Sequence, residues 1–152
     1  MKDLSLHILD IVENSIRAEA KRVEILVVED VANDVLSLQI KDDGRGMDPQ
    51  TLRRAADPFF SGRPGRRFGL GLALLAQATR EAEGQFEISS APETGTTITA
   101  AFRHSHPDRK PLGDLSATLE TLVAGNPGVD FCYEHRAGAE VIRFDTREVK
   151  RP

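Results

Sequence analysis

Residues 35–47 read VLSLQIKDDGRGM, an aliphatic run that ends in two aspartates and two closely spaced glycines. The run from Val35 to Lys41 is rich in β-branched and aliphatic residues, which indicates a strand. Asp42 to Met47 then form a tight loop, because Asp-Gly and closely spaced glycines favour turns. Glycines let backbone approach a flat ligand, and an aspartate at a strand end can accept a hydrogen bond from an exocyclic amine. A plain turn is the alternative, since Asp-Gly is common in turns.

A helix is predicted upstream over Leu6–Ala20, and Ser5 can serve as its N-cap. Its apolar residues recur at steps of three and four positions, as one buried helix face requires: Ile8, Leu9, Val12 and Ile16. A further strand is predicted over Val23–Val28. Residues 32–34 supply turn chemistry between it and the strand at residues 35–41, so the two strands are predicted to form a hairpin.

The opposite face of this helix is polar. Four residues fall within roughly 60° of one another on it: Asp10, Asn14, Arg17 and Lys21. Asp10 and Asn14 stand four positions apart, so their side chains lie one above the other. A carboxylate and an amide so placed can jointly hold a hydrated Mg²⁺, which takes oxygen ligands and keeps several waters. A solvated polar helix face is the alternative.

The region after the glycine-containing loop is irregular. Asp48-Pro49 opens a short helix that runs to about Ala56, with proline at the first helical position. From residue 57 to residue 68 the chain contains two prolines, two glycines and three phenylalanines, and it shows no regular period. Loops of about a dozen residues are usually functional. The three phenylalanines are expected to anchor this loop to the core: Phe59, Phe60 and Phe68.

Helical patterning resumes at Gly69-Leu70-Gly71-Leu72 and continues to Glu83, with Gly84 as a C-cap. A helix start preceded by glycine offers free N–H groups and the positive end of the helix dipole, which suits a phosphate. The segment matches neither a Walker P-loop nor a Rossmann fingerprint. Three arginines of the preceding loop can add charge-assisted phosphate contacts, with surface solubility as the alternative: Arg63, Arg66 and Arg67.

The rest of the chain is predicted to contain four strands and one helix. Their expected order is strands at Gln85–Ser90 and Thr96–Arg103, a polar linker at His104–Pro111, a helix at Asp114–Ala124, and strands at Val129–His135 and Ala139–Asp145. Helices and strands segregate along the chain, which favours an α+β fold. We expect a two-layer sandwich with helices on one face of a mixed, mainly antiparallel sheet.

Composition places the chain among ordinary globular proteins. It has 152 residues, of which 39% are hydrophobic and 29% charged, and this fits one domain with one core. The net charge of −4 gives no reason to expect nucleic acid or a membrane surface as a partner. No membrane-spanning run or signal peptide is evident, so we expect a cytoplasmic protein. The single cysteine, Cys132, is expected to be structural.

Taken in order, these motifs resemble those of the GHKL superfamily. Its members include sensor histidine kinases, type II topoisomerases, the heat-shock chaperone, mismatch-repair ATPases and anti-sigma serine kinases. The resemblance covers residues 4–103 and rests on Asp10-x-x-x-Asn14, Asp42-x-Gly44-x-Gly46, Pro58-Phe59-Phe60, Gly69-Leu70-Gly71-Leu72 and Gly95-Thr96. It implies helices on a mixed sheet with ATP bound under a lid, and ATP and Mg²⁺ as cofactors.

The resemblance also implies roles for individual residues. Asn14 is expected to bridge Mg²⁺ to the phosphates, and Asp42 to bind the exocyclic amine of adenine with Thr96 supporting it through a water. The loop glycines would make room for the base, Phe60 would fix the lid together with Phe59, and the glycines at the helix start would present N–H groups to the phosphates. The nucleotide-binding set is Asn14, Arg17, Asp42, Gly44, Gly46, Met47, Phe60, Arg67, Gly69, Leu70, Gly71, Leu72 and Thr96.

Asp10 stands where the hydrolases and serine kinases of this superfamily carry a glutamate that acts as general base, and where histidine kinases usually carry asparagine. Its side chain is about one methylene shorter than glutamate, and a general base must come within about 2.6–3.2 Å of its proton or act through one water. Asp10 is expected to be the catalytic base. Its shorter side chain leaves three alternatives: it works through water, it activates poorly, or it serves only as a second metal ligand beside Asn14.

We expect a solitary ATP-binding module in residues 1–104. Residues 105–152 are expected to form a helix and β-hairpin extension packed on the same domain. A dimer surface or a partner surface is the alternative role of this extension. No phosphoacceptor helix hairpin fits before Asp10, and His7 is not expected to accept phosphate. The expected function is that of a Mg²⁺-dependent ATP-binding regulator that phosphorylates or switches a protein partner. A slow ATPase acting as a clamp and a non-catalytic adaptor are the alternatives.

Overall fold

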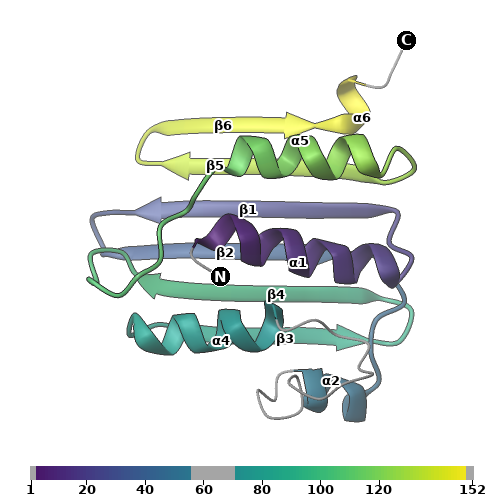
Figure 1. The fold of residues 1–152 in the computed structure, drawn as a ribbon, viewed down its shortest axis with the longest axis horizontal. Helices are drawn as coiled ribbons and strands as arrows, with labels where there is room; N and C mark the ends of the chain where they lie inside the picture. Colours follow the sequence, from purple (N-terminus) through teal and green to yellow (C-terminus); the bar gives the residue numbers. More distant parts are fainter. Residues whose placement is uncertain (1–2, 56–70, 150–152) are drawn as a thin grey trace.

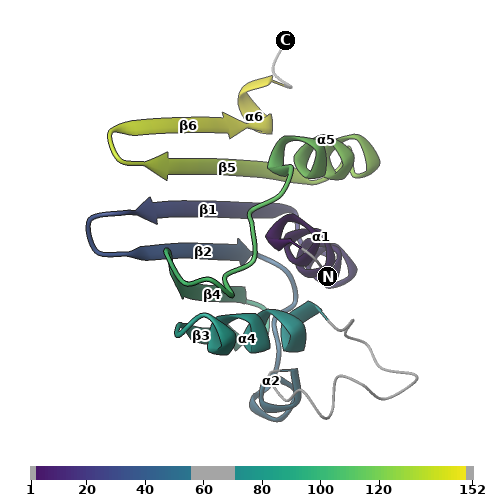
Figure 2. The ribbon, with the colours of Figure 1, turned by 60° about the vertical axis from the view of Figure 1, so that its left-hand side comes forward.

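The computed structural model describes residues 3–55 and 71–149. Within these residues one six-stranded sheet carries the helices on one face (Figures 1 and 2). The elements in chain order are α1 (Leu4–Arg17), β1 (Arg22–Asp30), β2 (Val35–Asp42), α2 (Pro49–Ala55), α4 (Gly71–Glu81), β3 (Gln85–Ala91), β4 (Gly95–Arg103), α5 (Leu115–Gly125), β5 (Asp130–Ala137), β6 (Glu140–Asp145) and α6 (Thr146–Val149). The predicted two-layer α+β architecture is confirmed.

The strand order in the sheet is β3-β4-β2-β1-β5-β6. All neighbouring strands pair antiparallel except β1 and β5, which are parallel. A parallel pair needs a long crossover connection, and here the chain between β1 and β5 includes β2, β3, β4 and α5. The sheet is therefore mixed and mainly antiparallel, as the segregation of helices and strands predicts.

The core lies between α1 and the sheet. Alternate residues of the two central strands are buried on the helix side: Val23, Ile25, Val27, Leu36, Leu38 and Ile40. The buried apolar residues of α1 are Leu4, Ile8, Ile11 and Val12. Leu9 and Ile16, which were expected on the buried face, pack against this core and are only partly buried. Ile11, which the predicted pattern did not include, is buried in this core at 1% exposure.

Helix α1 begins two residues earlier than predicted. Its N-cap is Asp3, whose carboxylate accepts a hydrogen bond from the Leu6 N–H at 3.1 Å. The predicted cap, Ser5, is buried inside the first turn and donates its hydroxyl to Asp3 at 2.6 Å, so that prediction was wrong. The helix ends at Arg17, before the predicted Ala20, because Glu19 adopts a left-handed backbone with φ of 63°.

The residues beyond 112 continue the same sheet. Strand β5 pairs with β1 in a register that places Asp130 beside Arg22, and β6 forms the outer edge. The short helix α6 follows β6 directly and is a difference from the sequence prediction. Its first residue, Thr146, accepts a hydrogen bond from the Phe131 N–H at 2.8 Å and so ties α6 to the start of β5. The boundary between a main domain and an extension stays a prediction.

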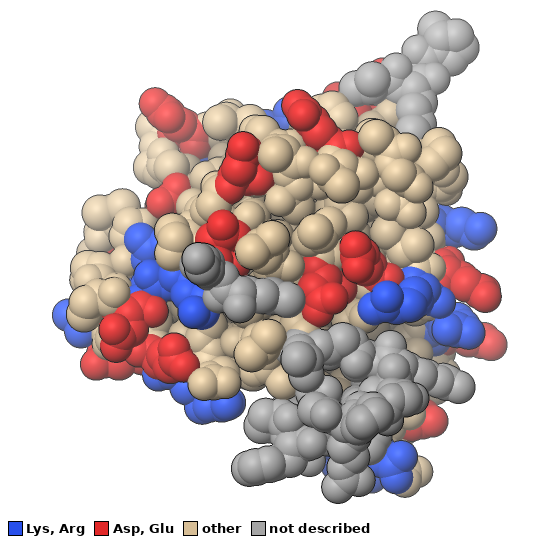
Figure 3. Space-filling view, viewed as in Figure 1, with Lys and Arg blue, Asp and Glu red and all other residues tan. Residues whose placement is uncertain are grey.

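No described helix, within residues 3–55 and 71–149, is long and apolar enough to cross a membrane. On the helix face, basic side chains lie next to acidic ones (Figure 3). This pattern agrees with the small negative net charge of the sequence.

His7 is an ionisable side chain inside this core. It lies on α1 and is only 1% exposed. Neither of its ring nitrogens has a hydrogen-bond partner in the described part of the chain. Burial lowers the pKa of His7, and the charge of Lys110 acts in the same direction, while the backbone of Gly71 and the charge of Asp10 oppose the shift. The folded protein therefore favours a neutral imidazole at this position.

The pH dependence of stability should report on His7. Because its pKa is lower in the folded state than its ordinary value of 6.5, the unfolded chain takes up the proton more readily. The free energy of unfolding should therefore fall as the pH drops below about 6.5. We expect His7→Leu to flatten urea-denaturation free energies between about pH 5.5 and 7.5, a window above the titration of carboxylates. An equal slope in wild type and variant would contradict this expectation.

Candidate functional site

Asp42 lies at the end of β2, and its carboxylate is held by two hydrogen bonds. Its side chain is 8% exposed. One carboxylate oxygen accepts the hydroxyl of Ser15 from α1 at 2.6 Å, and the other accepts the Gly44 N–H at 2.9 Å. A carboxylate has about four lone-pair sites, so two donors leave capacity for a ligand. Helix α1 and the loop after β2 together fix this acceptor.

The start of β4 lies directly beside Asp42. The strand register pairs Asp42 with Thr96, and the Thr96 hydroxyl lies 2.9 Å from the Ser90 hydroxyl of β3. Ser90 also accepts the Met47 N–H at 2.8 Å and donates to the Gly95 carbonyl at 2.8 Å. Ser90 therefore fixes both the loop after β2 and the turn before β4.

Two glycines of this loop, Gly44 and Gly46, lie so close to the backbone of neighbouring segments that a side chain would not fit. A Cβ at Gly44 would lie 2.8 Å from the Ala18 carbonyl oxygen. Gly46 has a φ of +70°, and a Cβ there would collide with the carbonyl of Ala91. Side chains at these positions would push the loop away from α1 and from β3. The expectation that these glycines also make room for a base stays a prediction.

Asp43 anchors the same loop to the start of β1. One of its carboxylate oxygens accepts the backbone N–H groups of Lys21 at 2.8 Å and of Arg22 at 2.9 Å. Its own N–H donates to the Arg22 carbonyl at 3.4 Å. The loop is thereby attached to three elements: α1 through Asp42, β1 through Asp43, and β3 through Met47.

Asp10 and Asn14 lie on α1 with unsatisfied polar atoms. One carboxylate oxygen of Asp10 and the side-chain nitrogen of Asn14 are buried and have no hydrogen-bond partner among the described residues. The Asn14 side-chain oxygen accepts a hydrogen bond from the guanidinium of Arg17. Buried polar atoms without a partner cost about 1–3 kcal/mol each, so a group that supplied the missing partners would be stabilising here.

The start of α4 rests against Asp10. A Cβ at Gly71 would collide with the Asp10 carboxylate, so glycine is required for this approach. The next residue, Leu72, is 2% exposed and belongs to the hydrophobic core. Its side chain therefore anchors α4 in the core.

The remaining predicted site residues lie outside the described residues. They are Phe59, Phe60, Arg63, Arg66, Arg67, Phe68, Gly69 and Leu70. Of the predicted set, the structure brings together Asp42, Gly44, Gly46, Met47 and Thr96 at one end of the sheet. It places Gly71 against Asp10 where α1 meets the start of α4, and Arg17 is bonded to Asn14 further along α1.

Comparison with known proteins agrees with this arrangement. Residues 2–106, more than half of the chain, match the family model described as histidine kinase-, DNA gyrase B-, and HSP90-like ATPase. The chain belongs to this family. The predicted membership of the GHKL superfamily is confirmed, and domains of this family bind ATP in signal transduction by sensor histidine kinases.

Several curated relatives are sensor proteins. A putative sensor protein of Shewanella frigidimarina is 34% identical over 103 residues, covering 66% of this chain and 16% of the relative. The sensor histidine kinase YxdK of Bacillus subtilis is 34% identical over 108 residues, covering 66% and 33%. The sensor protein kinase FleS of Pseudomonas aeruginosa is 38% identical over 92 residues, covering 60% and 23%. The matched regions make up a third or less of these relatives.

Among solved structures, the MutL ATPase domain of Aquifex aeolicus in complex with ADP is similar in fold. The TM-score is 0.58 at 15% identity, and the match covers 90% of this chain and 61% of that one. The coverage of this chain extends beyond the 2–106 match.

The donor set fits ATP with Mg²⁺. Mg²⁺ keeps several waters and is usually held by one or two protein groups together with substrate phosphates. Asp10 provides one such group, because one of its carboxylate oxygens is buried and has no protein partner in the described ranges. The side-chain oxygen of Asn14 is the second, and it now accepts a hydrogen bond from Arg17. No group of three or more His, Cys, Asp or Glu side chains in these ranges could hold a metal alone. A metal here would therefore depend on the nucleotide for part of its ligands.

Sequence reasoning missed three residues that shape this site. Ser15 holds Asp42, Ser90 holds Met47 and Thr96, and Asp43 holds the start of β1. The hydroxyl of Ser15 carried no signal, because it follows Asn14 on the helix and lies off the polar face. Asp43 was predicted only as part of the tight loop from Asp42 to Met47, with no contact to the start of β1.

The bond from Ser15 to Asp42 can be tested by Ser15→Ala. Hydrogen bonds to charged groups contribute about 1.5–3 kcal/mol, so the free energy of unfolding in urea should fall by about that amount. Ser89→Ala on the exposed side of β3 is the matched control and should cost less than about 0.5 kcal/mol. Equal losses in the two variants would show that the Ser15 hydroxyl does not hold Asp42.

Proposed function

We propose that this protein is a Mg²⁺-dependent ATP-binding regulator that phosphorylates or switches a protein partner in cytoplasmic signal transduction. The observation that carries the proposal is the Asp42 carboxylate, buried at the end of β2 and aimed by Ser15 and Gly44. Family membership supports the nucleotide, and the relatives support the signalling role.

Asp42 would select adenine. The exocyclic amine of adenine is a donor, and the remaining lone pairs of Asp42 can accept it. Thr96, paired with Asp42 across the strands, would hold a bridging water. Guanine presents a carbonyl oxygen at the same position, which would face the carboxylate without a proton between them. Discrimination against guanine would follow, because a buried acceptor would be left unpaired.

The phosphates would lie between α1 and the start of α4. Gly71 and Leu72 would offer backbone N–H groups at the positive end of the helix dipole. Mg²⁺, when bound, would neutralise part of the phosphate charge. Asn14 would take part in holding it, and this requires Arg17 to release the Asn14 oxygen that it now occupies. The freed guanidinium would then be available to the phosphates.

Asp10 would act as the general base. Its buried oxygen has no donor in the described residues, so it can accept a proton from a hydroxyl or a water.

A non-catalytic adaptor is the second candidate. The close contact of Asp10 with Gly71 favours the adaptor, because the short Asp10 side chain holds its carboxylate against α4 rather than extending it toward a substrate.

ATP binding should depend on Mg²⁺ and on Asp42. In calorimetric titrations we expect saturable binding by wild type and an increase in Kd of about 10- to 100-fold for Asp42→Asn, the equivalent of a lost charged hydrogen bond. Asp108→Asn makes the same change in charge on an exposed residue of the linker and should bind as wild type does. If wild type does not bind ATP, the proposed function fails.

Phosphate transfer or hydrolysis should depend on Asp10. We expect Asp10→Asn to lower turnover by about 100-fold or more, the size of a general-base contribution, with the ATP Kd little changed. Labelling of an added partner from γ-labelled ATP would identify a kinase, and phosphate release without labelling would identify a clamp-type ATPase. A wild type that binds ATP with no turnover, alone or with partners, would favour the adaptor.

A further inference from the structure

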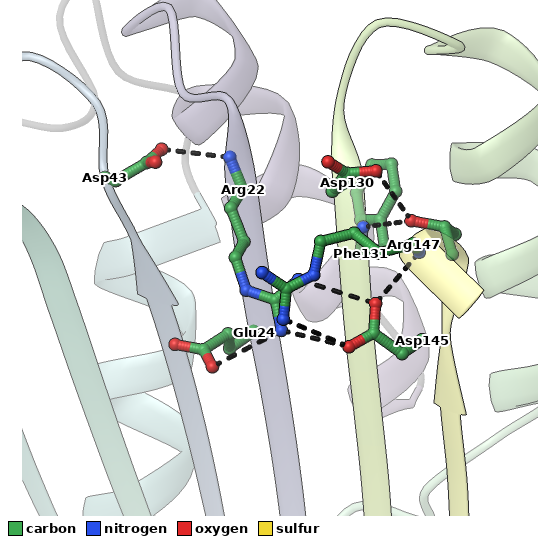
Figure 4. A network of polar contacts seen from close by, with 8 residues as sticks. Arg22, Glu24, Asp43, Asp130, Phe131, Asp145 and Arg147 are labelled. Atoms are coloured by element: carbon green, nitrogen blue, oxygen red, sulfur yellow. Dashed lines mark hydrogen bonds and ion pairs between the residues drawn. The ribbon is translucent and has the colours of Figure 1, made fainter. Parts of the chain in front are cut away.

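Arg22, the first residue of β1, is bonded from two sides (Figure 4). Its backbone N–H donates to the Asp43 carboxylate at 2.9 Å. Its guanidinium donates to the Asp145 carboxylate, at 3.2 Å from one terminal nitrogen and 3.5 Å from the other. Asp43 follows Asp42 in the loop of the site, and Asp145 is the last residue of β6. One residue therefore links that loop to the end of the chain's final strand.

Asp145 is a buried carboxylate with several donors. Its side chain is 4% exposed, and it also accepts the Arg147 N–H at 3.0 Å. The guanidinium of Arg22 holds the pKa of Asp145 well below its usual range. A buried charge that loses its partner is costly, so Asp145 keeps the Arg22 side chain in one position. Glu24, by contrast, approaches Arg22 only to 3.8 Å and is exposed.

We propose that Asp145 is a positioning residue for adenine recognition, because it holds the loop at residues 42–47 through Arg22 and Asp43. The inference rests on the proposed function, since it concerns the same nucleotide site. It assigns a role at that site to a residue outside the part of the chain that matches the ATPase family, residues 2–106.

The loop depends on where β1 begins. Asp43 is held by the backbone N–H groups of Lys21 and Arg22, both at the start of that strand. The same end is fixed from the other side by the last strands, since the Asp130 N–H donates to the Lys21 carbonyl at 2.8 Å and Asp145 binds Arg22. Fraying at this end would release Asp43, and with it the neighbouring Gly44 N–H that orients Asp42.

The test compares Asp145→Asn with Asp108→Asn, which has the same change of charge on an exposed linker residue. The Kd values of ATP and of inorganic tripolyphosphate are measured by calorimetry, because only ATP carries a base. We expect the ATP Kd of Asp145→Asn to rise by about 3- to 10-fold, as for residues that act through a network. Binding of tripolyphosphate should be unchanged, and Asp108→Asn should match wild type for both ligands.

Amide hydrogen exchange provides a second readout that needs no nucleotide. The Gly44 N–H should exchange faster in Asp145→Asn than in wild type, whereas the Leu38 N–H in the middle of β2 should not. Should Asp145→Asn fail to fold, Arg22→Lys takes its place, because it keeps the charge and loses the two-nitrogen contact.

The outcomes separate this inference from the proposed function. If wild type binds ATP and Asp42→Asn weakens it, while Asp145→Asn leaves both the ATP Kd and the Gly44 exchange unchanged, the positioning role is wrong and the function stands. Equal weakening of ATP and tripolyphosphate would also overturn it, because the effect would not concern adenine. If wild type binds no ATP, the function fails, and the exchange measurement still decides whether Asp145 holds the loop.

Discussion

The rotation of α1 about its own axis, fixed by its packing in the core, is the constraint on which the rest of the site depends. Ile8, Ile11 and Val12 are buried in the same hydrophobic core as the alternate residues of β1 and β2, and their burial fixes the rotation of the helix. With the rotation fixed, Asn14 and Ser15 take positions that they cannot change independently. Ser15 then reaches Asp42 across the layer at 2.6 Å. Close packing in a protein interior transmits small shifts, so the core and the Asp42 carboxylate form one rigid unit.

Sequence pattern was sufficient for the architecture and for part of the site. The β-branched runs located the strands that carry Asp42 and Thr96, and the polar face of the first helix located Asp10 and Asn14. Pattern could not show the contacts that orient these groups. Ser15 and Asp42 are 27 positions apart, and periodicity describes only residues on one element. The cap of α1 was misplaced because Asp3 and Ser5 are both good capping residues, and composition alone does not choose between them.

The glycines of the loop show that a residue of a family motif can also be required by the packing of the chain's own backbone. The resemblance assigns Gly44 and Gly46 to the space around a base. In the structure each is also required by this chain's own backbone, at Ala18 of the helix end and at Ala91 of β3. At Gly46 the backbone conformation is a further reason for glycine, because its φ is positive. A motif glycine can therefore serve folding and ligand approach together, and the sequence does not separate the two.

The parallel pairing of β1 with β5 has a consequence for how the protein is made. The ribosome releases a chain from its N-terminus, and domains generally fold in that order. Strand β1 has β2 on one side early, whereas its other neighbour starts at Asp130, which is about a hundred residues later. Until that segment is synthesised, one edge of β1 is open to pairing with other chains. The nascent chain is therefore exposed to aggregation through this edge during the whole interval between the synthesis of β1 and that of β5.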